Sequence, residues 1–265
     1  MAHADSSRPG PPPAAPLSGG RTYRLALAYD GTAFHGWQVQ PDVATVQGVL
    51  LQAARRLFPG DVRVTGASRT DAGVHALGQT VALTTVSPLA PATVLAALNA
   101  HLPREIRVVA AADAATGFDA RRSALGKRYA YLIDNASVPS PLLLRYAWHV
   151  SGPLDLAAMR QALEALRGRH DFSAFCAAPG READPVCRVR SAHAWRRKTL
   201  VALVISADRF LHHMVRNIVG SVVEVGRGSR PPQWVGEVLA TRDRARAGPT
   251  APAHGLTLLG VTYGP

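Results

Sequence analysis

Residues 62–85 read VRVTGASRTDAGVHALGQTVALTT and join two predicted strands through one turn-rich loop. The first strand is predicted over Val62 to Thr65 and the second over Gln79 to Thr85. The loop between them, GASRTDAGVHA at residues 66–76, contains a single carboxylate, Asp71. An isolated acid between two strands makes this loop the most informative segment of the chain.

Asp71 lies two residues after Arg69 and two residues before Gly73. An aspartate in a turn commonly does no more than bond to its own backbone. Here Arg69 could hold the carboxylate ionised and aimed, and Gly73 would let the backbone bend closely around a bound base. A serine-hydrolase elbow would need glycine where Thr70 stands, and a glycosidase would need a second carboxylate that this loop does not offer.

Strand and helix patterns alternate on both sides of this loop. Residues Arg21 to Tyr29 have the two-residue period of a strand. From Thr45, which is suited to N-capping, apolar residues fall at helical spacing as far as Leu57. Further helices are predicted at residues 91–100, 154–166, 211–225 and from just after Pro232 to about residue 241. Further strands are predicted at residues 106–111, 125–133, 145–150, 188–195, 200–207 and 256–263.

This order of elements predicts the α+β class. We expect two similar halves, each a mostly antiparallel sheet covered by helices, with the active-site cleft between them. Residues 1–20 form a Pro/Gly-rich stretch that cannot bury enough apolar area to order itself, and they are predicted to be a disordered tail. The N-terminal half is then residues 21–120, with the Asp71 loop, and the C-terminal half is residues 121–265.

The charge of the chain favours a phosphate-rich partner. Thirty Lys and Arg residues stand against 18 Asp and Glu, which gives a net charge of +12 over 265 residues. A balance this positive attracts nucleic acid through counterion release and steering. Because only Lys127 and Lys198 are lysines, genomic base composition is an alternative origin for the many arginines.

Cysteine usage and hydropathy exclude other classes. The two cysteines, Cys176 and Cys187, form no C-x-x-C pair, so no disulfide framework is predicted. A metal set of these cysteines with His170 and His193 lacks short chelating spacing and is disfavoured. No apolar run reaches membrane-spanning length, and the N-terminus lacks a secretory pattern. We therefore expect a soluble cytoplasmic protein.

The segment from Ser68 to Ala76 resembles the catalytic signature of the TruA-type tRNA pseudouridine synthases. Further blocks look like those of the same family and occur in its order. They are Tyr29-Asp30-Gly31-Thr32, Phe34-His35-Gly36-Trp37-Gln38, Lys127-Arg128-Tyr129, His170-Asp171-Phe172, residues 210–217 (FLHHMVRN) and Gly248-Pro249-Thr250-Ala251-Pro252. One departure is Ser68, where many relatives carry glycine.

The resemblance implies conversion of uridine to pseudouridine at positions 38, 39 and 40 of the tRNA anticodon stem-loop, with no metal and no organic cofactor. It implies that Asp71 is catalytic and that Tyr129, Arg69 and Arg216 bind the substrate, with Tyr129 stacking on the everted base. Packing beside Tyr131 is the alternative for Tyr129. Helical periodicity places Arg216 at the edge of an apolar stripe, from which it could pair with Asp71. The expected assembly is a homodimer.

RNA contacts are expected from basic residues that position the phosphate backbone without reading sequence. The candidates are Arg55, Arg56, Arg121, Arg122 and His212. Two other functions stay open at this point. One is a tRNA-binding protein without catalysis, and the other is a pseudouridine synthase that acts on a different RNA.

Overall fold

The strands of the N-terminal half form around the segment that contains the Asp71 loop. In the computed structural model, which describes residues 20–177 and 184–264, β2 (Arg63–Gly66) pairs antiparallel with β3 (His75–Thr85). β3 also pairs with β1 (Arg21–Tyr29), and β4 (Ile106–Asp113) lies at the other edge of β1. Alternate side chains of β1 are buried, as its two-residue period predicted. The tail predicted at residues 1–20 falls, apart from Gly20, outside the described residues.

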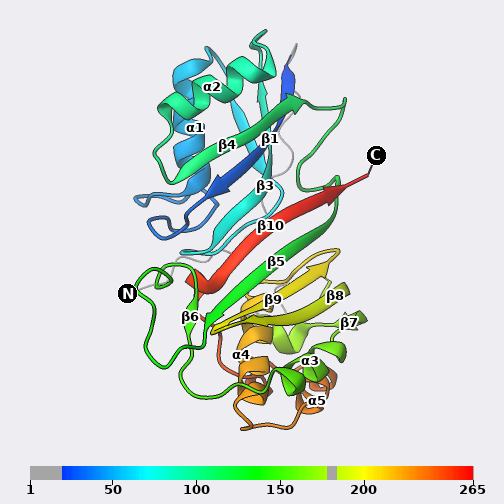
Figure 1. Ribbon diagram of the computed structural model, residues 1–265. Helices are drawn as coiled ribbons and strands as arrows, with labels where there is room; N and C mark the ends of the chain where they lie inside the picture. Colours follow the sequence, from blue (N-terminus) through cyan, green and yellow to red (C-terminus); the bar gives the residue numbers. More distant parts are fainter. Residues whose placement is uncertain (1–19, 178–183, 265) are drawn as a thin grey trace.

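Two helices belong to this half, α1 (Val46–Leu57) and α2 (Pro91–His101). The predicted cap of α1 is confirmed, because Thr45 Oγ1 accepts a hydrogen bond of 3.2 Å from the backbone N–H of Gly48. α1 buries its apolar stripe in the core, and α2 packs against β4. Both helices lie at the upper end of the molecule in Figure 1.

The strands of the C-terminal half are β5 (Ala124–Asp134), β9 (Leu200–Ala207), β8 (Val186–Arg197) and β7 (Gly168–Asp171), and they pair antiparallel in that spatial order. β7 was not predicted, because its four side chains are exposed or half-buried and show no apolar period. The strand predicted at residues 145–150 is too long, because only the two residues of β6 (Trp148–His149) pair with β5.

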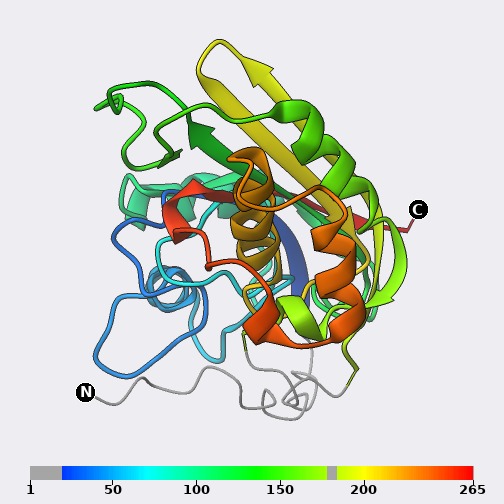
Figure 2. The same cartoon turned by 90° about the horizontal axis from the view of Figure 1, so that it is seen from below.

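The helices of this half are α3 (Leu156–Glu164), α4 (Met214–Gly226) and α5 (Trp234–Thr241). Figure 2 shows them together on one side of the C-terminal strands. Three short 3-10 helices complete the described chain: η1 (Ser173–Phe175), η2 (Arg244–Arg246) and η3 (Ala253–Gly255). α4 is the central helix, because most of its side chains are fully buried.

The start predicted for α4 is three residues too early. His213 has a φ of 58°, in the left-handed region, so the helix begins at Met214 and not at Leu211. The backbone N–H of Met214 donates to Leu211 in a turn that precedes the helix. His212 and His213 therefore belong to a turn at the helix entry, and their side chains can face the N-terminal half.

The last strand, β10 (Leu256–Tyr263), lies in the middle of the sheet between β3 and β5 (Figure 1). It runs parallel to β3, with Thr257 opposite His75, and antiparallel to β5. Ten strands of the described chain thus form one sheet, mostly antiparallel, and the predicted α+β class is confirmed. The parallel register places the start of β10 beside the end of the Asp71 loop.

Candidate active site

The Asp71 loop is held by the segment that follows β1. The Tyr29 and Thr70 hydroxyls are 2.8 Å apart, and the Trp37 backbone N–H donates to the Thr70 carbonyl at 3.0 Å. Gly36 has a φ of 85° and lies against the Asp71 loop, so that a Cβ added to it would be only 2.6 Å from the Thr70 carbonyl oxygen. Gly73 also has a positive φ, 78°, which a side chain would disfavour. The loop backbone is therefore fixed on the N-terminal side of the site.

The Asp71 carboxylate faces three nitrogen-bearing side chains from the entry of α4. Arg216 Nη1 lies 3.2 Å from Oδ2, His213 Nε2 lies 3.4 Å from Oδ2, and His212 Nε2 lies 3.7 Å from Oδ1. The Asp71 side chain is 23% exposed and that of Arg216 is 15% exposed. The pairing of Arg216 with Asp71 that periodicity predicted is confirmed, and it joins the two halves of the chain.

Arg216 is itself fixed by the segment between α5 and β10. Its Nε donates to the Ala251 carbonyl at 2.8 Å, and the Ala251 N–H donates to the Arg216 carbonyl at 3.1 Å. The adjacent Asn217, fully buried, accepts hydrogen bonds from Thr250 at 2.6 Å and from Arg244 at 3.1 Å. These hydrogen bonds hold the Arg216 guanidinium in the position from which it contacts the Asp71 carboxylate.

Tyr129 lies on β5 and reaches the loop through its hydroxyl, 2.8 Å from Ser68 Oγ. Phe210 packs edge-on against the Tyr129 ring, with centroids 5.1 Å apart. Burial raises the pKa of Tyr129 to about 12, the Ser68 hydrogen bond opposes the rise, and the charge of Asp71 adds to it. The phenol is therefore neutral at physiological pH. Tyr131 shares the strand but bonds elsewhere, to the Pro252 carbonyl at 2.7 Å.

The hydrogen bond between Ser68 and Tyr129 predicts energetic coupling between the loop and β5. Ser68→Ala and Tyr129→Phe should each lower the free energy of unfolding by about 1 kcal/mol. The double variant should lose about 1 kcal/mol less than the sum, because only one hydrogen bond is removed. Urea denaturation of the four proteins measures this coupling. Tyr131→Phe combined with Ser68→Ala is the matched control, and its two losses of unfolding free energy should add. Coupling as large in this pair would contradict the hydrogen bond between Ser68 and Tyr129 as its cause.

His213 is the histidine of the site whose pKa departs most from its ordinary value. Burial lowers its pKa to about 4; the Asp71 carboxylate opposes this shift, whereas the charges of His212, Arg216 and Arg244 add to it. The imidazole is therefore neutral near pH 7 and can accept a proton or a hydrogen bond through one nitrogen.

This depressed pKa predicts a pH dependence of stability. His213 takes up a proton near pH 6.5 in the unfolded chain and only near pH 4 in the folded chain. Its contribution to the free energy of unfolding is therefore fully present above pH 6.5 and is lost as the pH falls towards 4, because protonation then favours the unfolded chain. His213→Asn, which tolerates the left-handed φ, should flatten this decline. Urea unfolding at pH 7 and pH 5 tests it: an equal decline in both proteins would show that His213 is not the group responsible.

His75 connects the end of the loop to the C-terminal half. Its Nδ1 accepts a 3.0 Å hydrogen bond from the Gly31 N–H, so Nε2 carries the proton and faces the carbonyls of Arg145 at 2.8 Å and His254 at 3.1 Å. Tyr146 packs 5.1 Å from the His75 ring and donates to Asp30. His75, which belongs to the catalytic signature, therefore also ties β3 to segments 70 or more residues away.

The structure brings some of the predicted site residues together and leaves others apart. Arg216 and His212 contact the Asp71 carboxylate, and Tyr129 reaches the same loop through Ser68. His212 was predicted only as an RNA contact. Arg69 is exposed on the loop. The remaining candidates are exposed elsewhere, in the last turn of α1 and between β4 and β5: Arg55, Arg56, Arg121 and Arg122.

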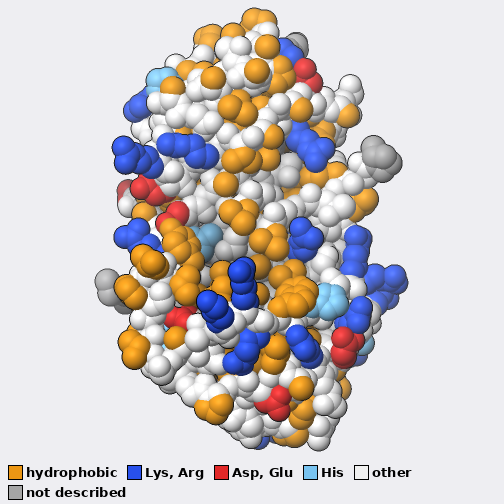
Figure 3. Space-filling model, in the orientation of Figure 1, with side chains coloured by type: hydrophobic (Ala, Val, Ile, Leu, Met, Phe, Trp, Pro, Cys, Tyr) orange, Lys and Arg blue, Asp and Glu red, His pale blue; other side chains and the backbone are white. Residues whose placement is uncertain are grey.

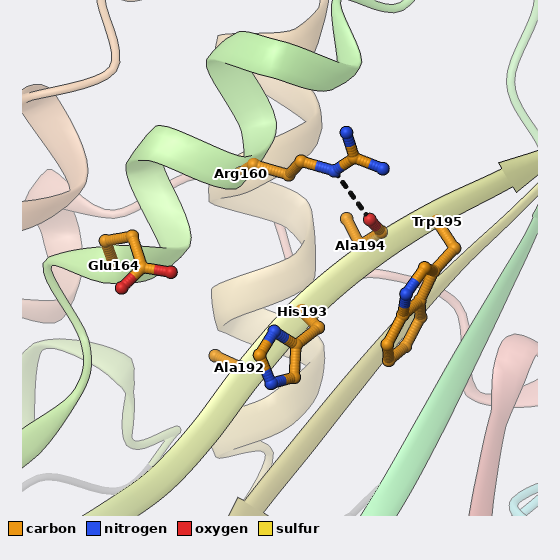
Figure 4. A pocket seen from close by; sticks show the side chains of 6 residues that line it. All are labelled: Arg160, Glu164, Ala192, His193, Ala194 and Trp195. Carbon is orange, nitrogen blue, oxygen red and sulfur yellow. Dashed lines mark hydrogen bonds between the residues drawn. The ribbon is translucent and has the colours of Figure 1, made fainter.

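A separate surface pocket of about 290 Å³ lies between α3 and β8 and shares no residue with the Asp71 cluster. Figure 4 shows Arg160 of α3 donating to the Ala194 carbonyl of β8, a hydrogen bond of 2.8 Å, with Trp195 and His193 among the other residues that line the pocket. β7 pairs only with the first residues of β8, so Arg160 satisfies part of a strand edge that is otherwise open there.

Comparisons with known proteins identify the family of the chain. A family model described as tRNA pseudouridine synthase matches residues 25–121 and 162–264. The tRNA pseudouridine synthase A of Myxococcus xanthus is 46% identical over 241 residues, covering 91% of each chain. That of Methylobacterium nodulans is 47% identical over 242 residues, covering 91% of this chain and 95% of the relative.

Likeness to solved structures is weaker. An H/ACA ribonucleoprotein bound to a substrate RNA containing 2′-deoxyuridine aligns with a TM-score of 0.36 at 10% identity, over 76% of this chain and 44% of that chain. This likeness establishes nothing about the fold. The sequence matches do establish the class: the chain is an isomerase, a pseudouridine synthase.

The chain belongs to the tRNA pseudouridine synthase family, because the family model matches both halves and relatives are 46 to 47% identical over about nine-tenths of its length. The family membership predicted from the Ser68 to Ala76 signature is confirmed. In residues 20–177 and 184–264, no helix is both long and apolar enough to cross a bilayer.

Proposed function

We propose that this enzyme isomerises uridine at positions 38, 39 and 40 in the anticodon stem-loop of tRNA, that Asp71 is its catalytic group, and that it works in the cytoplasm as a homodimer. Family membership supports the reaction. The observation that carries the site assignment is the ion pair between Asp71 of the N-terminal half, residues 21–120, and Arg216 of the C-terminal half, residues 121–265. Tyr129 of the C-terminal half reaches the same loop through its hydrogen bond with Ser68.

The reaction breaks the bond between N1 of uracil and C1′ of ribose, turns the base, and joins C5 to C1′. The C5 proton leaves to solvent and N1 gains a proton, so atoms and charge balance without a redox partner. Asp71 starts the reaction by attack on the sugar or base or by removal of a sugar proton. Arg216, fixed by Ala251, holds this carboxylate in its orientation.

The target uridine must leave the helical stack, at a cost of roughly a few kcal/mol. Tyr129 is the proposed stacking partner, and an aromatic contact of this kind contributes about 1–3 kcal/mol. Only 6% of Tyr129 is exposed, so Phe210 or the Ser68 loop must shift to admit the base face.

A basic surface supports tRNA as the substrate. Figure 3 shows Lys and Arg side chains gathered over the strands of the C-terminal half, with few acidic ones among them. The exposed basic residues of β5, β8 and the β8–β9 turn are Arg128, Arg188, Arg190, Arg196, Arg197 and Lys198. Together with the candidates Arg55, Arg56, Arg121, Arg122 and His212, they would hold phosphates and position the RNA by shape.

Unmodified tRNA transcripts test the proposal directly. One set carries a single uridine at position 38, 39 or 40, and a matched set carries it elsewhere in the same stem. After incubation with the purified enzyme, pseudouridine should map to the first set alone. Modification of ribosomal RNA fragments in place of tRNA would assign a different substrate, and binding of tRNA without any product would leave only the non-catalytic alternative.

A further inference from the structure

Asp71, His212 and His213 offer three ligand atoms that all lie within 4.8 Å of one another. We propose that these side chains form a binding site for a transition-metal ion of the Zn²⁺ or Co²⁺ type, and that the bound ion reversibly inhibits the enzyme. The inhibitory part rests on the proposed catalytic role of Asp71, whereas the binding part does not. Among the described residues no second group of this kind occurs, and the set of His170, Cys176, Cys187 and His193 does not assemble.

The spacing of the donor atoms suits a small tetrahedral ion. Ligand bonds of about 2.0–2.2 Å separate neighbouring donors in a tetrahedral zinc site by roughly 3.4 Å. The structure has 3.7 Å between His212 Nε2 and Asp71 Oδ1, and one donor atom from each of the three side chains lies within 4.8 Å of the others. Small side-chain rotations would close three ligands on one ion and leave the fourth position to water.

The chemistry of the donors selects the kind of ion. Two imidazoles and one carboxylate suit Zn²⁺, Co²⁺, Ni²⁺ and Cu²⁺. Mg²⁺ requires near-octahedral oxygen ligands and keeps much of its water. The Mg²⁺ that stabilises folded tRNA should therefore leave the site unaffected.

Arg216 opposes a cation at this position but does not block it. Its Nη1 contacts Oδ2 at 3.2 Å, while its Nε is held by the Ala251 carbonyl. A carboxylate has about four lone-pair sites, so Oδ1 can bind the ion while Oδ2 keeps the guanidinium. The charge repulsion makes the binding weak enough to reverse with a chelator.

Inhibition follows from competition for the same atoms. A carboxylate oxygen that coordinates a metal ion cannot at the same time attack the substrate or accept its proton. The ion would also hold the two histidines against the carboxylate and fill the space where the sugar must approach it. Raising the tRNA concentration should therefore relieve the inhibition.

Cobalt absorption tests the binding without reference to activity. Addition of Co²⁺ to the full-length enzyme should produce the visible ligand-field bands of tetrahedral cobalt, saturating at one ion per chain. A His212→Ala/His213→Ala double variant should lose these bands, and His193→Ala, which removes an exposed histidine far from Asp71, should keep them. Circular dichroism of each variant verifies the fold. The absence of bands from the wild type, or equal bands in the double variant, would overturn the proposal.

Inhibition by Zn²⁺ is the second test, and it addresses the inhibitory role of the bound ion. Micromolar Zn²⁺ should lower isomerisation by the wild type at least about tenfold, and EDTA followed by excess Mg²⁺ should restore it. Cobalt bands without zinc inhibition would refute the inhibitory role. If the bands appear while Asp71→Asn stays fully active, the metal site stands and the proposed function of Asp71 fails, so the two failures are distinguishable.

Discussion

Asp71→Asn is expected to lower tritium release from tRNA labelled at uridine C5 by about 10³-fold or more. Asparagine keeps the size of the side chain, but its amide is a poor nucleophile and a poor base. Loss of a general base costs about 10²–10⁴-fold, and loss of a nucleophile costs more. The amide can still accept one hydrogen bond from Arg216, so the junction between the halves should persist. Affinity for tRNA should change by no more than a few-fold, because phosphate contacts elsewhere dominate it.

Asp61→Asn is the matched control for this experiment. Asp61 is exposed between α1 and β2, in the same half of the chain and ten residues before Asp71. It should keep wild-type tritium release. Equal release by the Asp71 variant and the Asp61 variant would remove the catalytic assignment, since both substitutions delete one negative charge at the same pH.

Much of the local structure follows from the sequence because its causes are local. The two-residue period of β1 and the Thr45 cap of α1 depend on neighbours within a few residues, and both are present. The final strand, β10, has the predicted bounds. Its place between β3 and β5 could not be predicted, because strand periodicity does not tell which other strand will supply the hydrogen bonds.

The site was predictable in part for the same reason. Asp71 and Arg216 stood out, the first as the lone acid of its loop and the second by helical periodicity. His213 was not predicted as a site residue, because the apolar pattern places the start of the helix at Leu211 and so puts His213 inside it. The left-handed φ of His213, which ends this pattern in the structure, cannot be seen in the sequence. The bond between Ser68 and Tyr129 links residues 61 positions apart, and only the assembled sheet brings them together.

Arg216→Met should lower the rate of the chemical step by about 10²-fold, the order of loss that misplacement of a reacting group by about 1 Å produces. Methionine fills the space of the alkyl chain but leaves Asp71 without its guanidinium and the Ala251 carbonyl without its donor. The carboxylate is then free to turn towards His212 or His213. The loss should appear in the rate constant measured in single turnover, whereas KM measured in multiple turnover should change only weakly.

Arg216→Lys separates charge from geometry. A lysine restores the positive charge, but it cannot reproduce the planar fork that joins the Ala251 carbonyl and the Asp71 carboxylate. We therefore expect a rate between those of the methionine variant and the wild type. Arg227→Met, at the opposite end of α4 in an exposed pair with Glu224, is the matched control and should be fully active. If Arg216→Met were as fast as this control, the ion pair would be an incidental contact between the halves, and the carboxylate would be oriented by the loop alone.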